Sequence, residues 1–215
     1  MKSFVVIGIG RFGRALAMEL FRLGHEVLAI DKNEERVSSV ADYVTHAVRA
    51  DACDEQVLRS VGVRNFDCAI VAFADETQDS ILTTLLLKEA GVKYVVAKGH
   101  NELHTRVLQK IGADRVVFPE SDMGVRLAQV VSSTNLVDYI DISDDYSIIE
   151  MNVPPRWDGH SIRELDVRAR HGINILVVKS GDGRTLSVVP SPDYVIRRGD
   201  VLVVIGSNED IRKLK

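Results

Sequence analysis

Three glycines near the start of the chain, Gly8, Gly10 and Gly13, have the spacing G-x-G-x-x-G that can hold a phosphate group. They follow a short apolar run at residues 4–7 and precede an amphipathic run that starts at Arg14. In such a strand–turn–helix the first glycine allows the sharp turn, the second leaves room for a pyrophosphate, and the third lets helix and strand pack closely. The unpaired amides at the helix start face the anion, so the sequence predicts a nucleotide site.

The carboxylate of Asp31 is a second candidate for this site. It ends an apolar run at residues 26–30 and lies about twenty residues after the glycines, where a carboxylate can accept hydrogen bonds from both ribose hydroxyls. A 2′-phosphate would meet its negative charge, which argues against NADP but leaves NAD, ATP, ADP and AMP open. The alternative is a nucleotide-binding fold that has lost its ligand.

Two charged residues could act on the phosphates. Arg11 lies inside the glycine loop and can face phosphate from its own subunit or a neighbouring one, although a solvated surface arginine is the alternative. Glu120 follows a later expected strand, and a carboxylate beside phosphates requires a cation between them. Glu120 is therefore a candidate ligand for a divalent or monovalent cation bound with the nucleotide, with Mg²⁺ or Ca²⁺ as candidates, but stabilisation by the following helix explains it equally well.

The sequence contains little that indicates a catalytic site. His100 and His104 are four residues apart, but without a third ligand nearby they favour a ligand-contacting or surface role over a zinc site. We find no base with an orienting partner, and no Tyr-x-x-x-Lys couple on a helix. The sequence therefore predicts a binding protein that is not an enzyme, with an NAD-linked oxidoreductase as the alternative.

Elements that must position these residues alternate regularly over the first 120 residues. Strands and helices in alternation are typical of a Rossmann-like, doubly wound parallel sheet, an α/β fold. We expect strands at residues 4–7, 26–30, 45–50, 68–73, 93–98 and 115–118, and helices after 13, 33, 54, 76 and 100. Ligands bind beyond the carboxyl ends of such strands. Those ends carry Gly8, Gly10, Arg11, Asp31, Asp51, Phe73, Ala74, Asp75, Lys98, Gly99, His100 and Glu120.

The alternation breaks after residue 120. We expect a crossover helix and hinge at 121–134 and then a small α+β C-terminal domain at 135–215. Within that domain, strands are expected at 146–153, 173–178, 186–189 and 201–205, and helices at 161–170 and 209–214. Ser161 and Glu164 have the spacing of a capping box. The division is therefore a nucleotide-binding domain at 1–120, the hinge, and the C-terminal domain.

Composition limits the partners and the compartment. The 215 residues carry a net charge of −4 with dispersed basic residues, which argues against nucleic-acid binding. No apolar run approaches the ~20 residues of a membrane-spanning helix, and we expect no signal peptide. Cys53 and Cys68 fit free thiols in or beside core strands better than a disulfide. These features predict a cytoplasmic protein.

Several segments together resemble one family, the RCK-domain regulators of potassium transport, and more narrowly the cytosolic nucleotide-binding subunits of the Ktr and Trk uptake systems. The resemblance covers essentially the whole chain. The segments that carry it are residues 8–13, 24–31, 82–89, 110–115, 119–124, 165–169 with Gly172, and 198–202. The segments at 11–13 and 119–124 favour the Ktr branch.

The resemblance implies an assembly and ligands that composition does not show. Members form homodimers that build an octameric ring at the inner face of the cell membrane, beneath an integral membrane potassium-translocating subunit. ATP favours activity and ADP inactivity in the Ktr branch, whereas Trk-type relatives respond to NAD and NADH. A helix face within residues 81–87 is our candidate subunit contact.

The resemblance also assigns roles to individual residues. Arg11 would reach phosphate, Asp31 and Asn33 the ribose, Asp51 and Ala52 the adenine, and Glu120 a cation. Other residues implied around the nucleotide are Phe12, Lys32, Phe73, Ala74, Asp75, Lys98, Gly99, His100 and His104. Relatives can also bind cyclic di-AMP in the C-terminal domain, where the matching residues are Ile162, Arg168, Asn174, Ile175 and Pro190. An ordinary apolar dimer interface is the alternative there.

Overall fold

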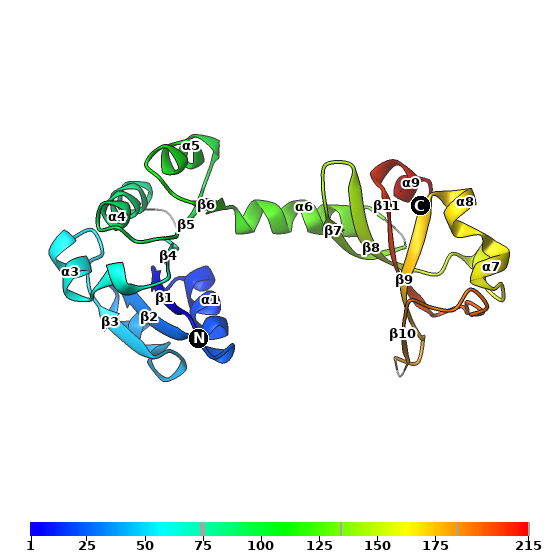
Figure 1. Ribbon diagram of the computed structural model, residues 1–215, viewed down its shortest axis with the longest axis horizontal. Coiled ribbons are helices and arrows are strands. Elements are labelled where there is room, and N and C mark those ends of the chain that lie inside the picture. Colours follow the sequence, from blue (N-terminus) through cyan, green and yellow to red (C-terminus); the bar gives the residue numbers. More distant parts are fainter. Residues whose placement is uncertain (74–75, 134, 184, 215) are drawn as a thin grey trace. The chain divides into compact units, whose positions relative to one another are not determined.

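The computed structural model describes residues 1–73, 76–133, 135–183 and 185–214. The chain forms two compact units, Met1–Pro119 and Glu120–Lys215, and each is considered by itself (Figure 1).

A parallel sheet organises the first unit. In the described part of this unit the sheet has six strands in the order β3-β2-β1-β4-β5-β6, and every neighbouring pair is parallel. The strands are β1 (Ser3–Ile7), β2 (Glu26–Asp31), β3 (His46–Arg49), β4 (Cys68–Val71), β5 (Val95–Lys98) and β6 (Arg115–Val117). The order reverses between β1 and β4, and the crevice beyond the strand ends at such a point is where ligands bind in this architecture.

Helices cover both faces of this sheet, as Figure 1 shows. They are α1 (Arg11–Arg22), α2 (Glu34–Ser38), α3 (Glu55–Ser60), α4 (Thr77–Glu89) and α5 (Glu102–Lys110). Because successive strand residues point to opposite faces, Val5 and Ile7 join one core with α3, α4 and α5, whereas Val6 joins another with α1. Burial on both faces explains why the central strands are continuously apolar.

The second unit is built on an antiparallel sheet with the order β10-β9-β11-β8-β7 in its described residues. Its strands are β7 (Leu136–Asp141), β8 (Tyr146–Asn152), β9 (Ile173–Lys179), β10 (Leu186–Val188) and β11 (Val201–Ser207). Its helices are α6 (Pro119–Val131), α7 (Ile162–Leu165), α8 (Val167–His171) and α9 (Asn208–Lys213). The predicted fold class, a Rossmann-like parallel sheet followed by a small α+β unit, is confirmed.

Some local expectations were wrong. The helix expected from residue 121 begins at Pro119, because proline suits the first turn of a helix, where its missing amide has no partner to lose. The strand β7 was not predicted, since its sequence is partly acidic and its position depends on pairing with β8. The helix expected at 161–170 is broken by Asp166, which adopts a left-handed conformation with φ 42°. The expected capping box between Ser161 and Glu164 is present.

No helix in the described part of the chain is long and apolar enough to cross a membrane.

Candidate functional site

The glycine turn has the geometry of an anion site. Gly8 has φ 92°, and its amide donates to the Ile30 carbonyl at 2.8 Å, which ties the turn to β2. A Cβ on Gly13 would lie 1.9 Å from the Gly8 carbonyl oxygen, so α1 can approach the turn only because residue 13 is glycine. At Gly10 an added Cβ would meet nothing within 4 Å, and no side chain caps α1. The first amides of α1 therefore lie open to a ligand.

Asp31 joins the end of β2 to this turn. Its side chain is 5% exposed, and its Oδ2 accepts the Ile9 amide at 2.7 Å while Oδ1 accepts the Asn33 amide at 2.8 Å. The Arg36 Nη1 lies 3.5 Å from Oδ2. A carboxylate has about four acceptor positions, so the ribose hydroxyls can still donate to Asp31. The residue is therefore both a support of the turn and a possible ribose ligand.

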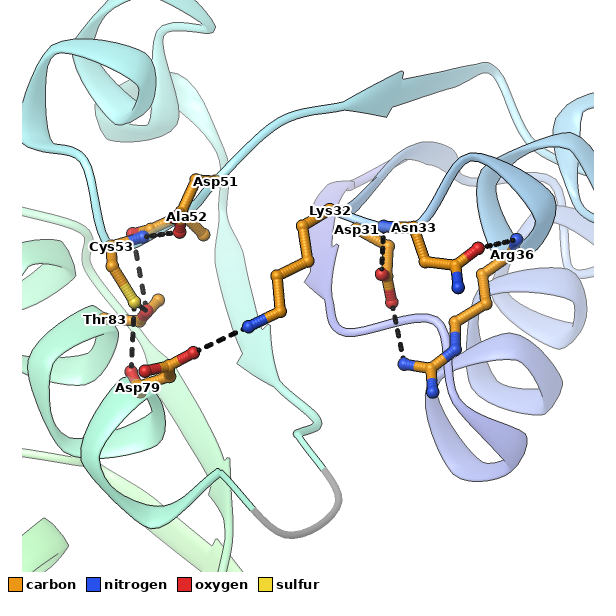
Figure 2. A network of polar contacts seen from close by, with 9 residues as sticks. All are labelled: Asp31, Lys32, Asn33, Arg36, Asp51, Ala52, Cys53, Asp79 and Thr83. Carbon is orange, nitrogen blue, oxygen red and sulfur yellow. Dashed lines mark hydrogen bonds and ion pairs between the residues drawn. The ribbon is translucent and has the colours of Figure 1, made fainter.

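The residues after Asp31 are held by other contacts. The Asn33 Oδ1 caps α2 by accepting the amides of Glu35 at 2.8 Å and Arg36 at 3.2 Å. Lys32 Nζ lies 3.1 Å from Asp79 Oδ2 at the start of α4, and Figure 2 shows this side chain crossing from β2 to α4. The hydrogen bond with Asp79 raises the pKa of Lys32 above its usual value. The turn after β2 is thus fixed on two sides.

A small pocket brings together several residues expected around the ribose and adenine. Those that line it are Ile7, Ile30, Asp31, Lys32, Ala50, Asp51, Ala52, Phe73 and Asp79. Asp79 was not anticipated from the sequence, because nothing in its local pattern distinguishes it from an ordinary first-turn acid. In the same network Thr83 Oγ1 donates to the Ala52 carbonyl at 3.3 Å and lies 3.6 Å from the Cys53 sulfur (Figure 2).

The end of β5 carries Lys98, Gly99 and His100. Lys98 is 7% exposed, and a Cβ on Gly99 would lie 2.6 Å from Thr105 Oγ1, so the chain packs tightly there. The rings of His100 and His104 are stacked, with centroids 5.0 Å apart and planes 12° apart. The structure therefore brings these two residues together.

Three predicted nucleotide-site residues cannot be judged from this geometry. Ala74 and Asp75 lie outside the described residues. Glu120 lies in the first turn of α6, at the start of the second unit, and its role as a cation ligand stays a prediction. Among the described residues there is no group of three or more His, Cys, Asp or Glu side chains that could hold a metal ion.

The second unit has a separate pocket. Ile162, Arg168, Asn174, Ile175 and Pro190, the residues matched to a cyclic di-AMP site, all line one open cavity of about 300 Å³. The cavity is also lined by Arg163, Asp166, Val167, Ile173 and Pro192. Sequence reasoning missed Arg163 and Pro192, which α7 and the loop after β10 bring to the same wall.

Comparison with known proteins identifies the family. The TrkA-N domain model matches residues 4–119 and the TrkA-C domain model matches residues 147–215. The chain is 49% identical to the Ktr system potassium uptake protein A of Bacillus subtilis, over 100% of this chain and 96% of that protein. The chain belongs to the Ktr family of potassium uptake proteins. The predicted resemblance to RCK-domain regulators of Ktr and Trk systems is confirmed.

A more distant member of the Ktr family agrees with this assignment, and a solved structure has the same fold. Potassium uptake protein A of the Ktr system of Vibrio alginolyticus is 35% identical, over 100% of this chain and 97% of that protein. The GsuK RCK domain has the same fold, with a TM-score of 0.70 at 21% identity; the alignment covers 99% of this chain and 46% of the GsuK chain.

Proposed function

We propose that this chain is the cytosolic, nucleotide-sensing subunit that gates an integral membrane potassium-translocating protein. The observation that carries the nucleotide part is the open start of α1 behind Gly10, placed beside the Asp31 carboxylate. An anion-binding turn and a ribose acceptor on neighbouring strands are what an adenine nucleotide requires. The Ktr relatives support the potassium part.

ATP and ADP are the proposed ligands, with NAD and NADH as the alternative. Asp31 is buried, and its negative charge would repel a 2′-phosphate on the ribose that it is proposed to bind. Arg11 is exposed at the first position of α1, where its guanidinium can engage phosphate of its own or a neighbouring subunit. A ligand shifts a conformational equilibrium only by its different affinity for the two states, so gating requires a contact that ATP makes and ADP lacks.

Calorimetric titration of wild type and Arg11→Ala with ATP and ADP tests this contact. The wild type is expected to prefer ATP and the variant to lose most of that preference; an ATP preference that is unchanged in the variant would exclude Arg11 as the sensor. Repeating the titration with Mg²⁺ or Ca²⁺, and with Glu120→Gln, tests the proposed cation. An ion that strengthens ATP binding in wild type but not in the variant supports Glu120 as its ligand.

Two apolar surfaces support a homo-oligomer. The side chains of Met123, Val125, Leu127 and Val131 on α6 are 55–72% exposed. In the first unit an open cavity of about 410 Å³ beside α1 is lined mainly by apolar residues, among them Phe12, Leu16, Ile70 and Val96. We propose that α6 of one subunit covers this cavity in another, as the first step towards an octameric ring with 121–134 as the hinge.

The other candidate contact, within residues 81–87, is smaller than expected, because Leu87 is fully buried and Leu82 and Leu85 are 42% and 36% exposed. The mass of wild type and Leu127→Glu in solution distinguishes the two surfaces. A monomeric Leu127→Glu protein supports the α6 contact, and an unchanged oligomer contradicts it.

The pocket of the second unit is the proposed site for cyclic di-AMP. Arg168 provides positive charge for a phosphate, and Ile162, Ile175 and Pro190 provide apolar walls for adenine. Titration with cyclic di-AMP tests the proposal, since Arg168→Ala should lose binding while Arg156→Ala, on the same unit but not lining the pocket, should keep it. Equal binding by both variants would favour a plain dimer interface.

A functional assay distinguishes the hypothesis of a regulatory subunit from the alternative hypothesis of an enzyme. Potassium uptake through a membrane partner should depend on this chain and respond oppositely to ATP and ADP, and the chain should co-sediment with partner-containing membranes. An NAD-linked oxidoreductase would instead oxidise or reduce nicotinamide with a small substrate and need no membrane partner.

A further inference from the structure

His100 and His104 form a stacked pair just after β5, and much of this pair is buried. His104 lies in the first turn of α5 and is 3% exposed, and the Asn101 side chain caps the same turn by accepting the His104 amide at 2.8 Å. His100 precedes the cap and is half-buried. The rings lie nearly parallel at a centroid separation of 5.0 Å.

Three of the four ring nitrogens of this pair are sealed from solvent without a hydrogen-bond partner. They are Nε2 of His100 and both Nδ1 and Nε2 of His104. Burial, and then the neighbouring His100, lower the pKa of His104 below its usual value of 6.5, so this ring is neutral at physiological pH. Because a sealed N–H without an acceptor is costly, Nδ1 of His100, the one nitrogen of the pair that is not in this sealed set, is the nitrogen that can donate a hydrogen bond to a ligand.

The strand order places this pair along the proposed ligand. The residues proposed for adenine follow β3, those for ribose follow β2, and the phosphate turn follows β1. The next strands in the same direction are β4 and β5, and β5 is two strand spacings, ~10 Å, beyond β1. The part of a nucleotide that extends past its first two phosphates therefore comes to the end of β5, and this is the part by which ATP differs from ADP.

We propose that His100 binds the terminal phosphate of ATP through Nδ1, and that His104 is a positioning residue that holds the His100 ring by stacking. The proposal rests on the proposed nucleotide function and deepens it. His104 does not touch the ligand, since both of its nitrogens are sealed. Holding the His100 ring by stacking therefore requires only a neutral aromatic ring at position 104.

Titration calorimetry of the full chain with ATP and ADP tests this with three variants. His100→Ala should weaken ATP binding about tenfold, the loss of one hydrogen bond to a charged group, and change ADP binding less than about twofold. His104→Leu keeps an apolar side chain but removes the ring, and should weaken ATP binding about fivefold. His104→Phe keeps a ring and should stay within about twofold of wild type. The double variant His100→Ala/His104→Leu should bind no more weakly than His100→Ala.

Two outcomes overturn the positioning role alone: ATP binding by His104→Leu equal to wild type, or an equal loss in His104→Leu and His104→Phe. A wild-type protein that binds neither nucleotide overturns both this inference and the proposed function.

Nitrogen NMR of histidine-labelled wild-type protein gives a second test, which uses no variant and therefore carries no risk of misfolding. ATP, but not ADP, should shift the Nδ1 signal of His100 more than either signal of His104; the reverse order contradicts the inference.

Discussion

Gly10 and Gly13 lie three residues apart at the start of α1, and we predict that replacing each by alanine impairs a different property of the protein. Gly13→Ala should destabilise the first unit, and Gly10→Ala should leave it stable but weaken its nucleotide binding. The same methyl group is added in both cases, so the difference tests the geometry of the turn rather than helix propensity.

The magnitude at Gly13 follows from one contact. The added Cβ would lie 1.9 Å from the Gly8 carbonyl oxygen and 3.2 Å from the Ala72 Cβ. The oxygen belongs to packed backbone, so α1 must withdraw from the turn by about 1 Å or more, and overpacking of this kind costs about 3 kcal/mol. For a unit of this size that lowers the thermal midpoint by roughly 10 °C.

At Gly10 the structure predicts little change in stability. The residue has φ −74° and ψ −170°, which alanine adopts readily, and an added Cβ meets no atom within 4 Å. Alanine is a poorer helix N-cap than glycine by about 0.5–1 kcal/mol, but it also stiffens the unfolded chain, which offsets most of this loss, so the net change in stability is within about 0.5 kcal/mol. The methyl group would occupy the space of a bound pyrophosphate, and ATP affinity should fall at least about tenfold, or ~1.4 kcal/mol.

Thermal unfolding followed by circular dichroism, with ATP titration of each folded variant, measures both effects. Gly124→Ala is the matched control, because an added Cβ there also meets nothing within 4 Å and it lies in the helix α6. The control should bind ATP normally and gain about 0.5–1 kcal/mol. A Gly13→Ala protein as stable as wild type, or normal ATP binding by Gly10→Ala, would refute the reasoning.

Three further predictions use other contacts. Asp31→Asn replaces one of the two acceptor oxygens by an NH₂ group, so one of the backbone amides that the carboxylate now accepts would lose its partner. Hydrogen exchange in the glycine turn should therefore quicken, and the free energy of unfolding should fall by about 1–3 kcal/mol. Burial raises the pKa of half-buried Cys53, and raises that of buried Cys68 to about 11, so iodoacetamide at pH 8 should label Cys53 first, and ATP should slow that labelling, as mass spectrometry can measure. Burial pushes the pKa of Asp114 up, but bonds from a lysine and a backbone amide outweigh it and hold the pKa below 3.8. Its carboxylate therefore stabilises the fold above about pH 4 and loses this effect as the pH falls, and Asp114→Asn should flatten the acid side of a urea-midpoint profile.

Much of the phosphate site could be predicted from sequence because its parts are local. Gly8, Gly10 and Gly13 are read from spacing alone, and Asp31 follows at the end of the next apolar run. Asp79 could not be found this way, since its meeting with Lys32 depends on the packing of α4 against the sheet. The second role of Asp31, as an acceptor for the Ile9 amide, likewise needs two strands side by side.

The second unit shows the same limit. Its capping box at Ser161 was visible because both partners lie within four residues. The break at Asp166 was not visible, because the surrounding residues continue a helical pattern and only the packed structure selects the left-handed conformation there.

The sequence by itself determined the alternation of strands and helices, the glycine turn, the acidic ribose candidate and the family. These depend on periodicity and short-range spacing, which act within a few residues of the chain. Only the tertiary structure decided which side chains share a pocket, which of two glycines is sterically required, and that His100 and His104 stack with sealed nitrogens. Those properties depend on atoms brought together from distant segments, where one carbonyl oxygen or one buried ring nitrogen changes what a residue can do.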